Sequence, residues 1–406
     1  MKLSLWASAL VATLTVQTVS SFASFAIPLL GPPLMARAGL APESIGLVSA
    51  TTSLGICWCL ASGGPMLSRY GPVRTLQIGL ACMALGLFAL SQPLGLLGLL
   101  GALAIGFGTG HNTPAGSQIL ARTAPPRHRT LIFSIKQAGV PLGGALAGLV
   151  VAPLALAHGL SATLWTVLGI VLLTVLLVQP FRRSLDGDRD PARQGWGRAL
   201  LSPAALLRSV RVLRTHPSLP LLTALGASFS VLQACLMAFT ATYVVTSHGV
   251  SLAEAGRIVA VMQVASMLAR IALGWLADRM GHALRHLVIQ AVISAAAVCL
   301  LVAMADQGGW VLYACAALAG ASAIGWNGVH MAELARLAPL SLVGEVTSAA
   351  GLFGFVGSVC GPLAFALVVT LSGSYELAFL IMAAQLAVFG LVSAAIFRPE
   401  QDGSER

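Results

Sequence analysis

The chain has 406 residues, of which 57% are hydrophobic and only 9% are charged, whereas about 25% of the residues in soluble domains are charged. This composition excludes an ordinary soluble protein and indicates a polytopic membrane protein. The net charge of +10 does not indicate a nucleic-acid partner, because the basic residues lie between apolar runs, where they orient a protein in a membrane.

Long apolar runs separated by charged or Pro/Gly-rich breaks predict twelve transmembrane helices. The first run follows Lys2 and resembles a signal peptide, but it continues to Leu30, so we assign it to a helix. The expected spans are 6–34, 44–66, 75–92, 94–120, 130–156, 161–180, 219–246, 252–277, 286–305, 310–334, 345–371 and 376–397.

The distribution of basic residues predicts the orientation. Placing the N-terminus inside puts 19 of the 23 lysines and arginines on the cytoplasmic side, with Arg37 as the clear outside exception. We therefore expect a multi-pass protein of the cell (inner) membrane with both termini cytoplasmic. The polar interval 181–218 carries eight arginines and is expected to be a cytoplasmic loop. It separates an N-terminal six-helix bundle, residues 1–180, from a C-terminal bundle with a short cytoplasmic tail, residues 219–406.

The two halves repeat each other in sequence, with an offset of 210 to 215 residues. Their order and near-constant offset indicate a duplicated six-helix unit, a construction typical of secondary transporters. The matched positions are Gly64 with Gly274, Arg69 with Arg279, Gly71 with Gly281, Gly110 with Gly325, and Asn112 with Asn327.

From the first to the last predicted helix, the sequence resembles the major facilitator superfamily. That family carries, after the second helix of each half, a loop that reads Gly, three residues, Asp, Arg or Lys, one residue, Gly. Residues 274–281 match it with Asp278, while residues 64–71 have Ser68 at the aspartate position. The resemblance implies an all-α membrane fold of twelve transmembrane helices in two pseudo-symmetric six-helix bundles. It also implies a cytoplasmic gating motif formed by Gly64, Arg69, Gly71, Gly274, Asp278, Arg279 and Gly281.

Two cations lie inside predicted helices. Lys136 interrupts an apolar run, and a charge near the bilayer centre costs at least about 2.5–3.5 kcal/mol on insertion scales, so such a charge normally faces a cavity, a partner or a ligand. The alternative is that Lys136 snorkels to the headgroup layer. Arg270 is expected at a similar depth on the helix 252–277. In carboxylate-transporting members of the family an arginine at this place contacts the substrate carboxylate, so the resemblance implies the same role for Arg270.

Polar residues on other helices complete the expected substrate site. Gln17, Ser21 and Ser24 follow helical spacing on one face of the first helix, although serine in membrane helices also serves packing. Glu333 and His330 are spaced to relay protons, and the alternative is that Glu333 binds Arg336. The expected substrate-binding residues are Lys136, Arg270, Gln17, Ser21, Ser24, His111, Asn112, Gln137, Gln233, Asn327 and His330.

The leading interpretation is a secondary active transporter that moves a small organic anion, a carboxylate, by alternating access as a symporter or antiporter. The alternative is a proton-driven exporter of drugs or metabolites with the same fold, and a non-transporting membrane receptor is less favoured. No HExxH or GxSxG pattern is present, so we expect no enzyme activity, no cofactor and no metal. The expected partners are the anionic substrate, protons or a counter-anion, and the lipid bilayer, with no nucleic acid and a monomeric state.

Overall fold

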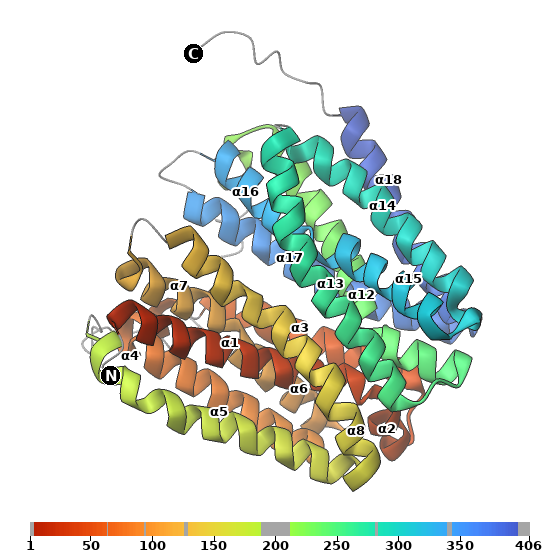
Figure 1. Ribbon diagram of the computed structural model, residues 1–406, viewed down its shortest axis with the longest axis horizontal. Coiled ribbons are helices and arrows are strands. Elements are labelled where there is room, and N and C mark those ends of the chain that lie inside the picture. The colour runs from red at the N-terminus through yellow and green to blue at the C-terminus, as the bar shows by residue number, and fades with distance from the viewer. Residues whose placement is uncertain are drawn as a thin grey trace.

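The protein is described by a computed structural model over residues 4–62, 64–92, 95–125, 129–187, 212–280, 283–338 and 343–396. Every secondary-structure element within these ranges is a helix (Figure 1). Ten helical segments of the described chain are long and apolar enough to cross a membrane. A helix satisfies its backbone hydrogen bonds internally, which hydrocarbon surroundings require. The predicted all-helical membrane protein is confirmed at this level.

The helices of the first half run mostly along the long direction of the molecule (Figure 1). Their bounds are α1 Leu5–Leu29, α2 Gly31–Ala38, η1 Pro42–Ser44, α3 Ile45–Ser62, α4 Gly64–Tyr70, α5 Pro72–Ser91, α6 Leu96–Gly110, α7 Asn112–Thr123, α8 Arg129–Val178, η3 Gln179–Phe181 and α9 Arg182–Leu185.

The second half begins after residues 188–211, which lie outside the described ranges together with most of the predicted central loop. Its bounds are η4 Leu213–Thr215, α12 Ser218–His248, α13 Leu252–Met280, α14 Ala283–Met304, η5 Ala305–Gln307, α15 Gly309–Ile324, α16 Asn327–Leu337, α17 Val343–Ser372 and α18 Tyr375–Ile396.

Three of the predicted spans are interrupted. The span 6–34 breaks at Leu30, where Pro32 and Pro33 open α2, because proline lacks the N–H that would continue a helix but suits the first helical turn. The span 94–120 breaks between α6 and α7 at His111, and the span 310–334 breaks between α15 and α16 at Gly325 and Trp326. Two of the breaks fall at matching positions of the repeat.

Gly159 separates the two predicted spans 130–156 and 161–180, which both belong to α8. Its φ of 80° and ψ of 167° lie in a region that favours glycine, and the chain folds back there (Figure 1). The predicted break in this stretch is confirmed.

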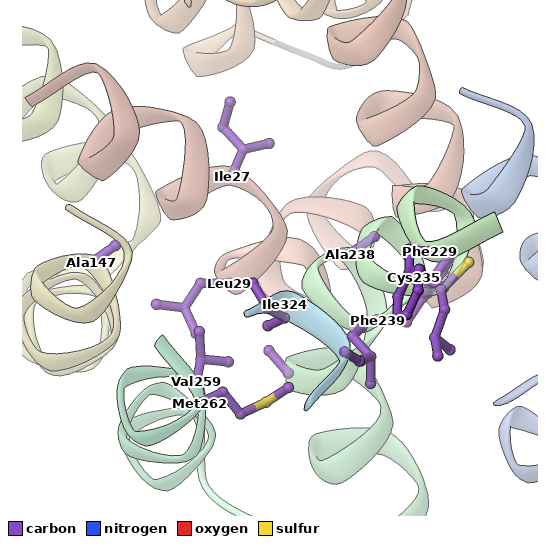
Figure 2. Packing of buried hydrophobic residues seen from close by; sticks show 14 of the residues in the cluster. Ile27, Leu29, Ala147, Phe229, Cys235, Ala238, Phe239, Val259, Met262 and Ile324 are labelled. Carbon is purple, nitrogen blue, oxygen red and sulfur yellow. The ribbon is translucent and has the colours of Figure 1, made fainter. Parts of the chain in front are cut away.

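Helices of each half pack mainly on one another. In the first half α1 packs on α8 and α6 packs on α3 and α5, while in the second half α12 packs on α17, α13 on α15 and α14 on α18. The two sets meet along two lines, α8 against α13 and α3 against α17. Figure 2 shows part of the shared core, with Ala147 on α8, Leu29 at the end of α1, and Val259 and Met262 on α13, all of them buried.

The line between α8 and α13, which we call the seam, is built on glycine. A Cβ atom on Gly148 would overlap the carbonyl oxygen of Gly256, and the reverse is also true. Backbones can approach this closely only where side chains are absent, as small residues allow in membrane helices. The second line is similarly tight, since a Cβ on Gly46 of α3 would lie 2.6 Å from the carbonyl oxygen of Pro362 in α17.

Arg37, the outside exception of the predicted topology, has a structural role. Its Nη2 donates to the carbonyl oxygens of Leu90 at 2.6 Å and Gln92 at 3.4 Å, where α5 ends. The last carbonyls of a helix lack partners within it and interact favourably with cations. Arg37 therefore stabilises the C-terminus of α5.

Candidate functional site

Lys136 lies inside the first half. Its side chain is 2% exposed, and its Nζ donates to the backbone carbonyl of Asn112 at 3.2 Å and to Oε1 of Gln137 at 3.3 Å. Gly116 of α7 makes room for it, because a Cβ there would lie 2.9 Å from the Lys136 Cε. In the described ranges no carboxylate pairs with Lys136, so neutral acceptors solvate its charge.

Polar side chains of α1, α6 and α7 lie near this lysine. Ser20 Oγ donates to Asn112 Oδ1 at 3.5 Å, and Ser24 Oγ lies 3.0 Å from Thr109 Oγ1. Gln17 Nε2 donates to Ser21 Oγ at 3.5 Å, while its buried Oε1 has no hydrogen-bond partner. The structure thus brings together the predicted residues of α1, α7 and α8, and we call Gln17, Ser20, Ser21, Asn112, Lys136 and Gln137 the first-half cluster.

His111 stands at the break between α6 and α7. Its Nδ1 donates to the carbonyl oxygen of Phe107 at 2.9 Å, and its ring packs edge-on against the Phe107 ring. The buried Nε2 has no partner in the described structure. His111 therefore stabilises the end of α6 and keeps one nitrogen available.

The seam fixes which residues of α8 and α13 stand opposite each other. Gly144 of α8 lies against the side-chain amide of Gln263 in α13, whose Nε2 is buried without a hydrogen-bond partner. The two helices run antiparallel, so a step of seven residues, about two turns, along each of them leads from this pair to Gln137 and Arg270. Gln137 is exposed, in contrast to its neighbour Lys136.

Arg270 is half-buried, and its Nε is buried without a hydrogen-bond partner. Gly325, at the break between α15 and α16, packs on Ala269, the residue before Arg270. A Cβ atom added to Gly325 would lie 3.1 Å from the Cβ of Ala269. In the described part of the chain neither a hydrogen bond nor an ion pair reaches Arg270. The Nε of this cation is therefore a buried donor without an acceptor, and among the described residues no hydrogen bond or ion pair joins Arg270 to Lys136.

The remaining predicted residues of the second half lie around Trp326. Its Nε1 donates to Gln233 Oε1 at 2.9 Å, and its ring stacks on Phe229 with centroids 5.0 Å apart. His330 packs edge-on against Trp326 and its Nε2 donates to the carbonyl oxygen of Leu222 at 2.9 Å. Asn327 is half-buried and begins α16.

Glu333 pairs with Arg336, the alternative partner that the sequence allowed. Arg336 Nε and Nη2 donate to the two carboxylate oxygens at 2.7 and 2.8 Å, while the Glu333 side chain is 6% exposed. This bidentate geometry is the strong form of an ion pair. A role of Glu333 and His330 in proton coupling stays a prediction.

The first copy of the gating motif is joined to an unexpected carboxylate. Asp186 accepts hydrogen bonds from the backbone N–H groups of Val73 at 2.7 Å and Arg74 at 3.1 Å, at the N-terminus of α5. Gly71, with φ 85°, makes space for it, because a Cβ there would lie 2.7 Å from the Asp186 Cγ. A carboxylate at this position satisfies free N–H groups and complements the helix dipole.

Arg69 and Ser68 also make contacts in the first copy. The second copy of the motif is described only in part. The side chains of Asp278 and Arg279 and the whole of Gly281 lie outside the described residues, and for Gly274 only its position in α13 is described. The gating role of the seven motif residues therefore stays a prediction.

Four residues of these sites were missed from the sequence. Gln263 is an amide within an apolar span and could have been found by the same argument as Lys136. Trp326 and Thr109 adjoin predicted residues at the helix breaks, whereas Asp186 had no signal, because it meets α5 across 113 residues of sequence.

Comparisons with known proteins agree with this geometry. The description "Major Facilitator Superfamily" belongs to a family model that matches residues 13–354. An uncharacterized MFS-type transporter of Mycobacterium tuberculosis is 28% identical over 302 residues, which are 72% of this chain and 63% of that protein. The 4-hydroxybenzoate transporter PcaK of Pseudomonas aeruginosa is 28% identical over 284 residues, 63% of this chain and 62% of that protein. The matches therefore span less than two thirds of these curated relatives.

Among solved structures, the crystal structure of the peptide transporter POT in complex with sulfate has a TM-score of 0.78 with 15% identity, covering 96% of this chain and 94% of that one. At this identity the likeness shows the fold alone. Together with the family match over most of the chain, it leads to one conclusion. This protein belongs to the major facilitator superfamily.

Proposed function

We propose that this major facilitator transporter is a secondary active carrier of a small organic anion that it recognises by a carboxylate. In this proposal twelve spans form two six-helix bundles, residues 1–180 and 219–406, joined by a cytoplasmic loop at 181–218. The protein lies in the cell (inner) membrane with both termini cytoplasmic, and it works as a monomer by alternating access.

The observation that carries the proposal is the state of Arg270. A buried donor without an acceptor is expensive, since it costs about 1–3 kcal/mol and more when the group is charged. Its Nε has no acceptor, and its guanidinium has a planar fork of donors that matches a carboxylate. A substrate carboxylate is the acceptor that this group lacks.

Gln137 is the second group that we place in the site. The seam register puts it at the level of Arg270 on the opposite half, and its side chain is exposed. Its Oε1 accepts from Lys136, which orients the amide so that its N–H groups are free to donate to an anion. In this proposal Gln137 contacts the anion and Lys136 does not. Lys136 holds the Gln137 side chain in position, and its positive charge strengthens anion binding.

The other predicted site residues lie partly in the first half of the protein and partly in the second. Gln17 keeps a free Oε1 and Asn112 a free Nδ2 in the first-half cluster, while Asn327, Gln233 and His330 lie in the second half. We propose that these groups contact the uncharged part of the substrate. One relative supports the substrate class, because the transporter PcaK is named for 4-hydroxybenzoate, an aromatic carboxylate.

The two groups that meet the carboxylate come from different halves. An anion held by both Arg270 and Gln137 interacts more strongly when the halves approach at this level, so it favours that arrangement over the open one. A ligand shifts a conformational equilibrium only by such a difference in affinity. Substrate binding thereby drives the step that exchanges the open side.

A matched pair of compounds tests the substrate class. Purified protein is heated with 4-hydroxybenzoate or with 4-hydroxybenzyl alcohol, which differs by the loss of the carboxylate. We expect the acid alone to raise the unfolding temperature, because ligand at about 100 times its Kd stabilises the folded state by about 2.7 kcal/mol. A panel of aliphatic carboxylates with their alcohols extends the comparison.

Uptake into proteoliposomes tests transport separately. The stabilising acid should accumulate inside vesicles that contain the protein, and protein that binds it without moving it would be a receptor. Stabilisation by the alcohols, or by cationic drugs instead of acids, would overturn the anion proposal in favour of the exporter.

A further inference from the structure

An open apolar groove lies along the seam, on the stretch of α13 from Arg257 to Leu268. It has a volume of about 560 Å³ and is walled by α8, α13 and α15. Its apolar lining consists of Leu149, Ala260, Val261, Val264, Ala265 and Leu268. We call this cavity the seam groove.

The seam groove is open to the side of the molecule. Leu149 is 53% exposed and Leu268 is 59% exposed, as expected for side chains that face hydrocarbon. Along α13 the lining extends from Arg257 to Leu268, which corresponds to roughly 16 Å of helix rise. This length matches one leaflet, about half of the 30 Å hydrocarbon core.

One end of the groove is polar. Arg257 belongs to the lining, and its side chain is 56% exposed. Its Nη2 pairs with Glu254, whose other oxygen accepts from the hydroxyl of Tyr313 at 2.6 Å. Glu254 thus holds the guanidinium at the mouth, and of the five N–H donors of arginine most stay available.

We propose that the seam groove binds one phospholipid, with a phosphate oxygen on Arg257 and one acyl chain along α13 as far as Leu268. The arginine fork suits a phosphate, and the apolar lining suits the chain.

The lipid would contact both halves of the protein. Leu149 belongs to the first half, and Arg257, Val264 and Tyr313 belong to the second. The groove therefore exists only while α8 and α13 stay together at this level, next to the contact of Gly148 with Gly256. A bound lipid stabilises this arrangement by mass action.

Photocrosslinking tests the binding site. The full-length protein is placed in nanodiscs with a small fraction of phosphatidylethanolamine that carries a diazirine midway along one acyl chain. After irradiation we expect the label on the α13 peptide around Val261 to Leu268 and on the α8 peptide around Leu149. Equal labelling of α13 and the lipid-facing surface of α14 would show an ordinary lipid belt and overturn the proposal.

Two matched variants identify the acyl-chain contact. Val264→Trp fills the groove, whereas Val292→Trp adds the same bulk on α14 at nearly the same exposure, 43% against 41%. We expect labelling of α13 to fall about tenfold in the first variant, the loss of most chain contacts, and to stay unchanged in the second. Unaltered labelling in Val264→Trp, at a wild-type unfolding temperature, would contradict the proposal.

The phosphate contact has its own test. Arg257→Gln removes the charge at the mouth but keeps the apolar lining, so labelling by the phospholipid should fall about tenfold, as expected for the loss of a charge-assisted hydrogen bond. A diazirine diacylglycerol, which lacks the phosphate, should label wild type and Arg257→Gln equally. If the diacylglycerol labels the wild type as strongly as the phospholipid does, Arg257 is not a headgroup site.

Discussion

The two ends of the contact between α8 and α13 are built differently. At the level of Gly148 and Gly256 the backbones touch, and no side chain separates them. At the level of Gln137 and Arg270 the two helices carry an amide and a cation, and the guanidinium has a buried nitrogen without an acceptor. One end is closed by its own backbones, whereas the other leaves a buried donor without an acceptor among the described residues.

The same contrast separates Lys136, which is buried, from Arg270, which is half-buried. Lys136 has a backbone carbonyl and an amide oxygen within its own half, but Arg270 has neither among the residues that the structure describes. Burial alone therefore does not identify a ligand group. A ligand group is identified by finding buried donors that have no acceptor, because an unsatisfied buried donor costs about 1–3 kcal/mol and more when it is charged.

The largest effect is expected at the glycine end. Gly148→Leu drives a side chain into the carbonyl oxygen of Gly256 and against Ala260, and such overpacking costs about 1–3 kcal/mol or more. We expect a lower unfolding temperature in detergent. Gly169→Leu is the control, since nothing lies within 4 Å of a Cβ at Gly169. Equal behaviour of the two variants would show that the glycine contact is not a close one.

Arg270→Ala tests the other end. Because the guanidinium makes no hydrogen bond within the described protein, its loss should leave the unfolding temperature unchanged or raised, yet weaken carboxylate affinity by about 10- to 150-fold, equivalent to 1.5–3 kcal/mol. Arg270→Lys should recover only part of this loss, because lysine lacks the planar fork. Arg285→Ala, at an exposed position of α14, is the control. Wild-type affinity in Arg270→Ala would place the anion elsewhere.

Lys136→Met tests how much less Lys136 contributes to carboxylate affinity than Arg270 does. Methionine fills similar space and leaves the Asn112 carbonyl and the Gln137 amide without their donor, so we expect affinity to fall only about threefold, less than 1 kcal/mol. Titration of the variant with the stabilising acid gives the value. A loss as large as that of Arg270→Ala would mean that Lys136 itself binds the anion as a second cation.

The smallest effect is expected midway along the seam. Gln263 is 1% exposed and its Nε2 has no partner, so Gln263→Leu removes an unsatisfied donor and should change the free energy of unfolding by at most about 1 kcal/mol, with a gain as the expected sign. Affinity for the acid should not change. If it falls with Gln263→Leu, the amide belongs to the substrate path and the division between the two ends is wrong.

Much of the fold could be predicted from the sequence because hydrophobicity and length determine membrane spans. The reversal between 156 and 161 was found from its break in the apolar pattern, and Gly159 provides it. The breaks at Leu30, His111 and Gly325 were not predicted, because the hydrophobicity continues across them. A helix can change direction inside the apolar layer when other groups satisfy its free backbone atoms.

The site was predictable in its residue types but not in its pairings. Lys136 was found because a charge in an apolar helix is conspicuous, but its main partner is the backbone carbonyl of Asn112, and no sequence pattern marks a main-chain acceptor. Asp186 likewise binds backbone N–H groups of a distant helix. Contacts between a side chain and a remote backbone are determined by packing, which the sequence pattern does not reveal.

Gly159 also bears on how the chain enters the membrane. The apolar stretch from Ile135 to Leu185 is 51 residues long without a polar loop. As one straight helix it would be about 75 Å long, against a hydrocarbon core of about 30 Å. A single reversal therefore decides whether the stretch crosses once or twice. Because every later helix takes its direction from the one before it, the left-handed backbone of one glycine sets on which side of the membrane each loop of the second half emerges.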